Sequence, residues 1–208
     1  MVLDKSIAEN LRRRYEMLDA ERRLLSRTQL ANYYETFRQR FGPEELQNLD
    51  GEALLKKMHG RDKDSLVYWL EFKNDEEFSA RFGSIAGGSA LKFGIYYRSE
   101  TQTWRTGAPS NQRDISVEEA IEYARKHRDQ LVRGVGLLHS LPENGTDEDY
   151  RALQESMDEE APDVSDSAWG HKYFHLLFPD KLDDYHNANY QRYHLIKLLQ
   201  VPPHGDGR

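Results

Sequence analysis

Aromatic and basic side chains gather on both sides of a predicted turn and could contact nucleic acid. A turn is predicted at residues 98–100. Tyr97 and Arg98 lead into this turn, and Trp104 and Arg105 follow it. Aromatic rings stack on exposed bases, while arginine binds phosphate. Inward packing of alternate strand residues, Trp104 in particular, would give the same pattern. We therefore predict a DNA contact at these four residues, with packing as the alternative.

A glycine-rich loop lies before Lys92 and could bind an anion. Backbone amides around Gly88 and Ser89 can form a nest for a phosphate, with Lys92 close by. The spacing from the glycines to Lys92 is not that of a P-loop, and a strand rather than a helix is predicted to follow. A tight turn in which glycine supplies positive φ angles is the alternative.

Glu71 and Lys73 have the E-x-K spacing found in many metal-dependent nucleases. In those enzymes two acids hold Mg²⁺, and the lysine helps to position the attacking water. The upstream acids are poorly placed to supply the second carboxylate: Asp64 is too close in sequence, and Asp50 lies in a predicted helix. A nuclease therefore remains an alternative function rather than the leading one.

Two other groups of charged or metal-binding residues have an ordinary explanation. His171 and His175 are one helical turn apart, as zinc ligands often are, but aromatic neighbours suggest a half-buried helix. Arg12, Arg13 and Arg14 form either a phosphate-contacting stripe or a solvated helix face paired with nearby acids. We predict neither a metal nor any other cofactor.

The spacing of apolar residues predicts an α+β fold. Helical periodicity runs through residues 1–60, after Ser116, from Trp169 to Phe178 and from Asn189 to Leu199. Strands are expected near 65–73, 90–98 and 101–106, forming a small antiparallel sheet packed with several helices. The first strand contains Trp69. A short helix is expected at 75–82, and Gly134 and Gly136 are expected to end the helix that begins after Ser116.

These elements suggest five segments along the chain. We expect a helical N-terminal segment at 1–60, an α+β core at 61–140 and an acidic connection at 141–166. C-terminal helices at 167–200 would pack on the core, and 201–208 would begin a linker. The acidic connection is expected to hold at most one short helix, near Tyr150 to Met157, and it is a candidate domain boundary.

Composition limits the classes of protein to consider. The 208 residues carry a net charge of −7 and no cysteine, which excludes disulfides and thiolate metal sites. Twelve tyrosines, eight phenylalanines and three tryptophans favour a folded core over disorder. No apolar run has the length of a membrane span, so we expect a cytoplasmic protein without membrane contact. Acidic residues are concentrated between 143 and 166, while the first 133 residues carry most of the arginines and lysines, so a basic face remains compatible with the acidic total.

The middle and end of the chain resemble the region before the motor in McrB-like AAA+ proteins of restriction and defence systems. The resemblance rests on the sequence from Phe82 to Gly94, on Trp104, on 116–121 and 128–132, and on 169–181. It covers about 65–199 and leaves out the first 60 residues.

The resemblance implies a non-enzymatic domain that recognises DNA, either plain or modified. Its implied partners are an AAA+ motor in the same full-length chain and a separate nuclease subunit. A sharper form of the hypothesis places a flipped base in an aromatic pocket near Trp69 or Trp104. A protein-interaction adaptor in such a complex and a Mg²⁺-dependent nuclease around Glu71 and Lys73 are the alternatives.

Overall fold

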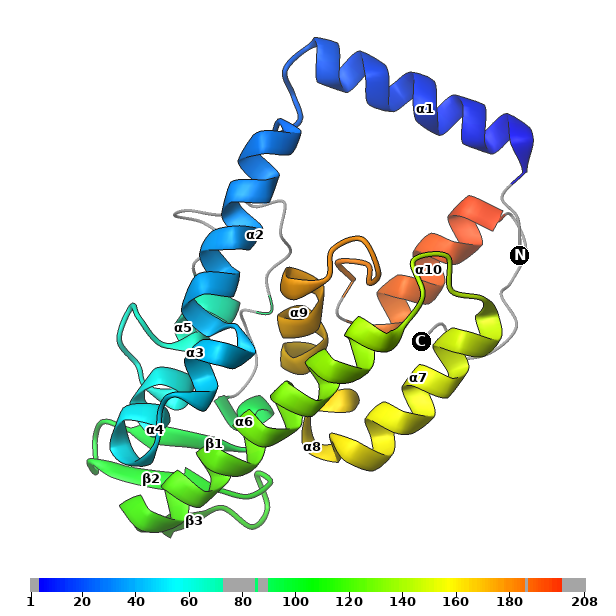
Figure 1. Ribbon diagram of the computed structural model, residues 1–208. Coiled ribbons are helices and arrows are strands. Elements are labelled where there is room, and N and C mark those ends of the chain that lie inside the picture. Colours follow the sequence, from blue (N-terminus) through cyan, green and yellow to red (C-terminus); the bar gives the residue numbers. More distant parts are fainter. Residues whose placement is uncertain (1–3, 73–84, 86–89, 186, 200–208) are drawn as a thin grey trace. The chain divides into compact units, whose positions relative to one another are not determined.

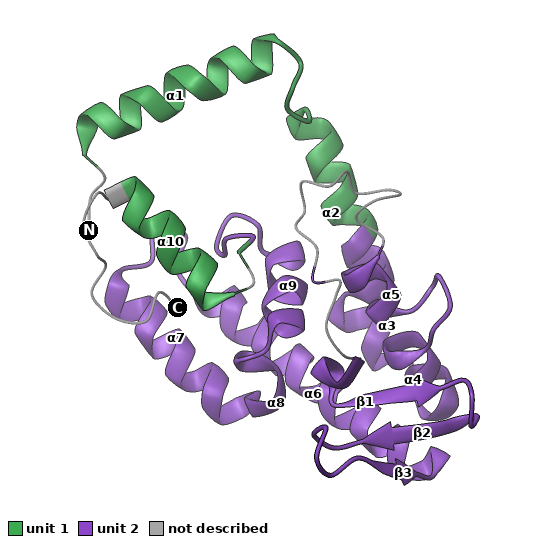
Figure 2. Ribbon diagram, turned by 180° about the vertical axis from the view of Figure 1, so that it is seen from behind, with its two compact units in different colours: residues 1–36, 185–208 green, residues 37–184 purple. Residues whose placement is uncertain are grey.

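The structure, a computed structural model, describes residues 4–72, 85, 90–185 and 187–199 (Figure 1). It has an α+β fold, as the sequence predicts. The chain divides into two compact units, residues 1–36 with 185–208 and residues 37–184 (Figure 2). No helix in the described ranges is long and apolar enough to span a membrane.

The first unit is helical. It contains α1 (Lys5–Ala20), the first part of α2 (Arg27–Phe41) and α10 (Ala188–Leu199). The predicted capping box begins α2. The backbone amide of Gln29 donates to Ser26 Oγ, and the backbone amide of Ser26 donates to Gln29 Oε1. Apolar side chains on α1 and α10 are largely exposed, Tyr190 at 65% among them. This unit therefore has little core among its described residues.

The second unit is built around one long helix, α6 (Val117–Ser140). In Figure 1, α6 runs through the middle of the unit, with α4 (Gly51–His59) along its first half and α7 (Asp147–Glu160) along its second. Three shorter helices complete this part: α3 (Pro43–Gln47), α8 (Pro162–Ser165) and α9 (Ala168–Leu177). The buried face of α6 follows helical spacing, as predicted, through Ala120, Ala124, His127 and Leu131.

The prediction that α6 ends at its glycines was wrong. The helix continues through Gly134 and Gly136 for a further turn and ends at Ser140. Gly134 faces α9, where an added Cβ would meet the ring of Phe174, so the missing side chain allows the two helices to approach closely. At Gly134 the glycine therefore reflects helix packing rather than a helix end.

The predicted strand near 65–73 is also wrong, because this segment forms helix α5 (Leu66–Glu71). Ser65 caps it, since the Tyr68 amide donates to Ser65 Oγ at 3.2 Å. Leu66, Trp69 and Leu70 are buried at helical spacing. A short continuous apolar run fits a buried strand or a buried helix equally well, so periodicity could not decide.

The sheet is small and antiparallel, with strand order β1-β2-β3. A 3₁₀ turn, η3 (Ala90–Phe93), leads into β1 (Ile95–Arg98), and β2 (Thr103–Thr106) pairs with it in the predicted hairpin. Gly94 connects η3 to β1 and has a φ of +77°, a backbone conformation that favours glycine. The sequence analysis missed β3 (Arg113–Ile115), which is only three residues long.

The expected acidic connection is mostly helical. Helices α7 and α8 occupy much of it, and Met157 and Val164 are buried. Thr146 and Asp149 form a capping box at the start of α7. The expected helix at 75–82 lies outside the described residues, and the five predicted segments remain a prediction.

Candidate functional site

A pocket of about 990 Å³ lies beside the hairpin in the second unit. Helix α5 contributes one wall, the hairpin contributes the other, and the end of α4 and the turn η3 close the pocket between them. The residues that contribute to its lining and matter most for its chemistry are His59, Arg61, Tyr68, Glu71, Phe72, Tyr96, Tyr97, Arg98, Arg105 and Gln112. Aromatic rings thus stand on both walls, with three arginines around them.

The aromatic side chains leave ring surface available to a ligand. Tyr68 on α5 and Phe72, the residue that caps its C-terminal end, have ring centroids 5.6 Å apart, and Phe72 is 51% exposed. On the opposite wall, the Tyr96 hydroxyl donates to Gln112 Oε1 at 3.3 Å, which steadies its ring. A flat molecule entering between the two walls can therefore contact rings on both sides.

The sheet separates the predicted cluster onto two faces. Tyr97 stands directly opposite Trp104, and their rings meet edge to face at 5.4 Å. Tyr96 stands opposite Arg105 on the other face. Trp104 is only 8% exposed, whereas Tyr97, Arg98 and Arg105 line the pocket. Trp104 therefore packs beside Tyr97 on the buried face of the sheet, which is the inward packing that the sequence left as an alternative.

Each arginine of the pocket is oriented by a neighbour. Arg105 Nε lies 2.7 Å from Asp114 Oδ1, and its Nη1 donates to Gln112 Oε1 at 3.3 Å. Arg61 donates to the Ser99 hydroxyl, and Arg98 pairs loosely with Glu100 at 3.6 Å. A guanidinium has five N–H donors, so these contacts position the groups without using all of their capacity.

Glu71 and Lys92 form an ion pair that ties α5 to η3. Lys92 Nζ also donates to the Ile85 carbonyl at 2.5 Å. Glu71 is therefore engaged with a cation at the end of a helix, not at a strand end as the nuclease hypothesis expects. Lys73, Gly88 and Ser89 lie outside the described residues, so their part in either hypothesis remains a prediction.

Trp69 lies in the core beneath the pocket wall. It is 1% exposed, and its Nε1–H donates to the Lys63 carbonyl at 2.9 Å. Its ring meets Phe41 edge to face at 5.3 Å, and Arg40 lies over it at 5.0 Å. These contacts hold α5 against the end of α2. The Trp69 ring has no exposed face on which a base could stack.

A buried histidine pair, which the sequence analysis missed, lies at the back of the site. His59 ends α4 and lines the pocket, and its Nε2 is 3.1 Å from Nδ1 of His127 on α6. Burial lowers the pKa of His127 to about 4, and burial with the neighbouring His127 lowers the pKa of His59 well below its usual value. Both rings are therefore neutral at pH 7.

The pair leaves one polar atom unused. His59 Nδ1 is buried and has no hydrogen-bond partner among the described residues. Leaving such a buried atom without a partner is energetically unfavourable. Two histidines 68 positions apart carry no sequence signal that would associate them.

His171 and His175 are packed rather than assembled into a metal site. His175 Nδ1 lies 2.9 Å from the Leu182 carbonyl, and burial lowers the pKa of both rings. In the described ranges, no cluster of three or more histidines, cysteines or acids could hold a metal ion.

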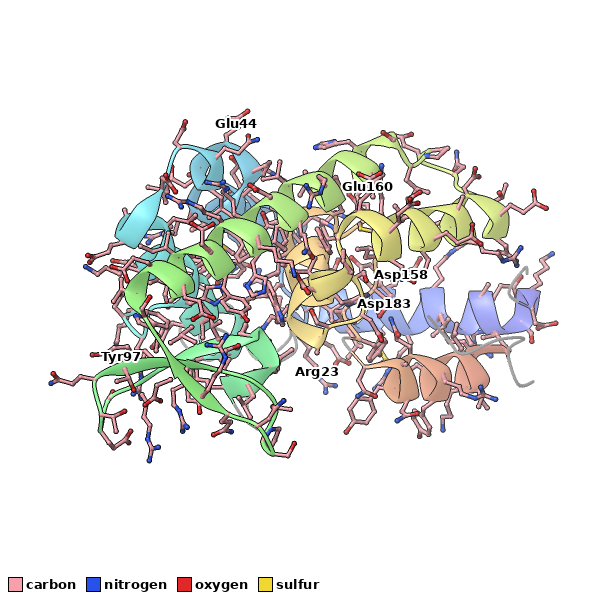
Figure 3. All side chains as sticks on the ribbon, turned by 90° about the horizontal axis from the view of Figure 1, so that it is seen from below. Arg23, Glu44, Tyr97, Asp158, Glu160 and Asp183 are labelled. Carbon is pink, nitrogen blue, oxygen red and sulfur yellow. The ribbon has the colours of Figure 1, made fainter. Side chains whose placement is uncertain are left out.

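The acidic side chains at the end of α7 lie away from the pocket. Figure 3 labels Asp158 and Glu160 at the end of α7, far across the view from Tyr97 on the hairpin. The pocket itself is lined by three arginines and two glutamates. The net charge of −7 is thus a property of the whole chain and not of this site.

Comparisons with known proteins found no relative. No family model matches the chain, and neither a curated protein nor a solved structure is significantly similar to it.

Proposed function

We propose that the chain is a non-enzymatic domain that recognises DNA through an exposed base held in the hairpin pocket. The observation that carries the proposal is the set of aromatic rings that line one pocket together with three arginines: Tyr68 and Phe72 come from the α5 side, and Tyr96 and Tyr97 come from the hairpin. Stacked rings hold a base of any identity, and arginine adds phosphate and cation–π contacts.

Position and size also support a base as the occupant. The pocket lies along β1, which is at one edge of the described sheet, so a strand of nucleic acid can approach without displacing a sheet partner. Its volume of about 990 Å³ is ample for a base with part of its backbone. A base in a duplex must leave its stack to enter, which is the base-flipping form of the hypothesis.

Membership of an NTP-driven restriction or defence complex rests on the sequence resemblance alone. The proposal retains the AAA+ motor in the same full-length chain and the separate nuclease subunit as expected partners. The adaptor alternative has one specific observation in its favour, the exposed tyrosines of α10, Tyr190 and Tyr193. The nuclease alternative has less support, because the Glu71 carboxylate forms an ion pair with Lys92.

The test is a titration of labelled single-stranded DNA, plain duplex and methylated duplex at two salt concentrations. Binding is expected for the single strand and for at least one duplex, with weakening at higher salt. Because three arginines line the pocket, the slope of log K against log salt for the single strand should be no steeper than about −2. No binding of any probe at low salt would contradict the proposal. Capture of a nuclease partner by a chain that ignores DNA would favour the adaptor.

A further inference from the structure

The three arginines of the pocket differ in how their charge is balanced. Arg105 Nε lies 2.7 Å from Asp114 Oδ1, and the Arg105 side chain is only 18% exposed, so its charge is largely offset within the protein. Arg61 and Arg98 are both exposed. Among the described residues, Arg61 has no ion-pair partner, and Arg98 has only Glu100, at 3.6 Å. Two of the three charges are therefore available to a ligand.

The acids that line the pocket do not change this balance. Glu71 already has a cation of its own, because it forms an ion pair with Lys92. Glu100 is 74% exposed, and its distance of 3.6 Å from Arg98 Nε is longer than a hydrogen bond. An exposed pair of this kind contributes little in water. One loosely held carboxylate thus stands against two arginines, and the pocket has an excess of positive charge near Glu100.

Arg61 and Arg98 come to the turn of the hairpin from distant parts of the chain. Arg61 follows the end of α4, and Arg98 is the last residue of β1. The Arg61 guanidinium donates to the hydroxyl of Ser99, the residue after Arg98, and both arginines line the pocket. Like charges that come together repel each other, and an anion that contacts both relieves the repulsion. Each guanidinium has N–H donors left for such an anion.

We infer that Arg61 and Arg98 form a phosphate subsite at the hairpin turn, where one phosphate of the bound strand contacts both guanidinium groups and replaces Glu100 beside Arg98. Arginine suits this role because its planar fork of donors matches phosphate oxygens. The inference rests on the proposed function, since the base lies in the same pocket. It adds that the unit bound is a base together with an adjoining phosphate, and that Arg105 is not a phosphate contact.

Glu100 gives the inference a prediction of opposite sign. Its carboxylate is the group that a phosphate must displace from Arg98, and it repels the phosphate as well. Glu100→Gln should therefore tighten the binding of DNA by about two- to fourfold, the range of an exposed ion pair. A gain of affinity from the loss of a side-chain charge is not expected if Glu100 and Arg98 only solvate the surface.

The probe is a labelled duplex with one unpaired base opposite an abasic site, because such a base is easily exposed. A single uncharged methylphosphonate replaces the phosphate on the 5′ side of the unpaired nucleotide, the phosphate on its 3′ side, or one four nucleotides away. For the wild-type chain, one of the two adjacent replacements should weaken binding by about three- to tenfold, and the remote one by less than about twofold. The side that gives the loss identifies the phosphate that is bound.

Two variants and a matched control connect this loss to the arginines. Arg61→Gln and Arg98→Gln should each weaken binding of the unmodified probe, and in each the cost of the adjacent methylphosphonate should fall below about twofold. Arg151→Gln removes the same charge from an exposed position on α7 that does not line the pocket, so it should retain the full cost.

Three results would overturn the inference: equal costs of the methylphosphonate at all three positions in the wild-type chain, retention of the full cost by either pocket variant, or weaker binding by Glu100→Gln. In each case the proposed function survives, provided that the probe with an unpaired base is bound more tightly than a fully paired duplex. If no probe binds, both proposals fail together.

The salt dependence of the wild-type chain provides a readout that does not depend on how the variants fold. Loss of one phosphate contact should make the slope of log K against log salt shallower by about 0.7–0.9. The probe with the methylphosphonate at the bound position should show this change, and the probe with the remote replacement should not. Equal slopes for these two probes would contradict a phosphate subsite.

Discussion

His59 and His127 share a hydrogen bond between Nε2 and Nδ1 at 3.1 Å, in the interface between α4 and α6. The pair connects two properties of the second unit. It fixes a neutral ring at the back of the pocket, and it places two ionisable groups where protonation is unfavourable. The second property makes the stability of the unit depend on pH.

Folded stability should fall as the pH is lowered from 7 towards 4.5. The pKa of His127 is depressed to about 4 in the folded chain, against 6.5 for the free side chain, so the unfolded state takes up the proton first. Stability is fully present above pH 6.5 and is lost progressively down to about 4, by about 3 kcal/mol for this group. His59 acts in the same direction.

Urea unfolding at several pH values measures this loss, and His127→Asn is the matched variant. The asparagine amide lies near Nδ1, so it preserves a partner for His59 and removes one titrating group. Its stability should depend less steeply on pH than that of the wild-type chain. Some dependence will remain, because burial also lowers the pKa values of His171 and His175. Identical slopes for the two proteins would show that His127 is not the group responsible.

The two glycines of α6 should respond to alanine in opposite ways. An alanine Cβ at Gly134 would meet the Phe174 ring, with Cε1 at 2.7 Å, and Met157 Sδ at 3.1 Å. Phe174 is buried and cannot move away cheaply, so Gly134→Ala should destabilise the unit by about 1–3 kcal/mol. At Gly136 an added Cβ meets nothing within 4 Å, so Gly136→Ala should stabilise by about 0.5–1 kcal/mol through helix propensity.

Thermal unfolding of the two alanine variants tests this difference directly. Gly136→Ala should raise the midpoint temperature and Gly134→Ala should lower it. If both raised it, the contact between α6 and α9 would be looser than the structure describes.

Helix caps and the hairpin turn could be predicted from the sequence, because each depends on residues that are close together along the chain. The capping residues Ser26 and Ser116 begin helices as expected, and the hairpin forms around the predicted turn. The segment around Trp69 failed for a physical reason. Apolar residues stand both on its buried face and on the face that lines the pocket, so the sequence shows no alternation that would distinguish a strand from a helix.

The candidate site was less predictable, because its defining contacts join residues far apart in the chain. The sequence placed Tyr97, Arg98 and Arg105 near one another, and all three line the pocket. It could not show that α5 supplies the facing wall through Tyr68 and Phe72, because that requires the tertiary packing of α5. The His59–His127 pair likewise follows from the packing of α4 on α6.

Removal of one buried hydroxyl should weaken the link between α9 and the end of α2. Tyr173 is fully buried, and its hydroxyl donates to the Phe41 carbonyl at 2.8 Å. Tyr173→Phe preserves the ring contacts and leaves that carbonyl without this donor, at a cost of about 1–2 kcal/mol. Tyr150→Phe is the control, because the Tyr150 hydroxyl donates to Lys181 O at an exposed position where water can replace it. Equal losses in urea unfolding would contradict the buried bond.

Truncation of one pocket tyrosine should weaken DNA binding without unfolding the chain. Tyr96 lines the pocket on the face of the sheet opposite Trp104, so Tyr96→Ala removes stacking surface and leaves the Tyr97–Trp104 contact intact. Stacking on one aromatic side chain contributes about 1–3 kcal/mol, which corresponds to about a five- to hundredfold weaker Kd for single-stranded DNA. The measurement is a fluorescence titration with the labelled single strand at low salt.

Tyr190→Ala is the matched control for this titration. Tyr190 is also a tyrosine with a largely exposed ring, but it lies on α10 and belongs to the other compact unit. Its removal should leave the Kd within about twofold of the wild-type value, because it is not among the residues that line the pocket. Equal weakening by both substitutions would mean that the exposed tyrosines contribute non-specifically. Weakening by Tyr190→Ala alone would move the binding surface to α10, where the adaptor hypothesis also places a contact.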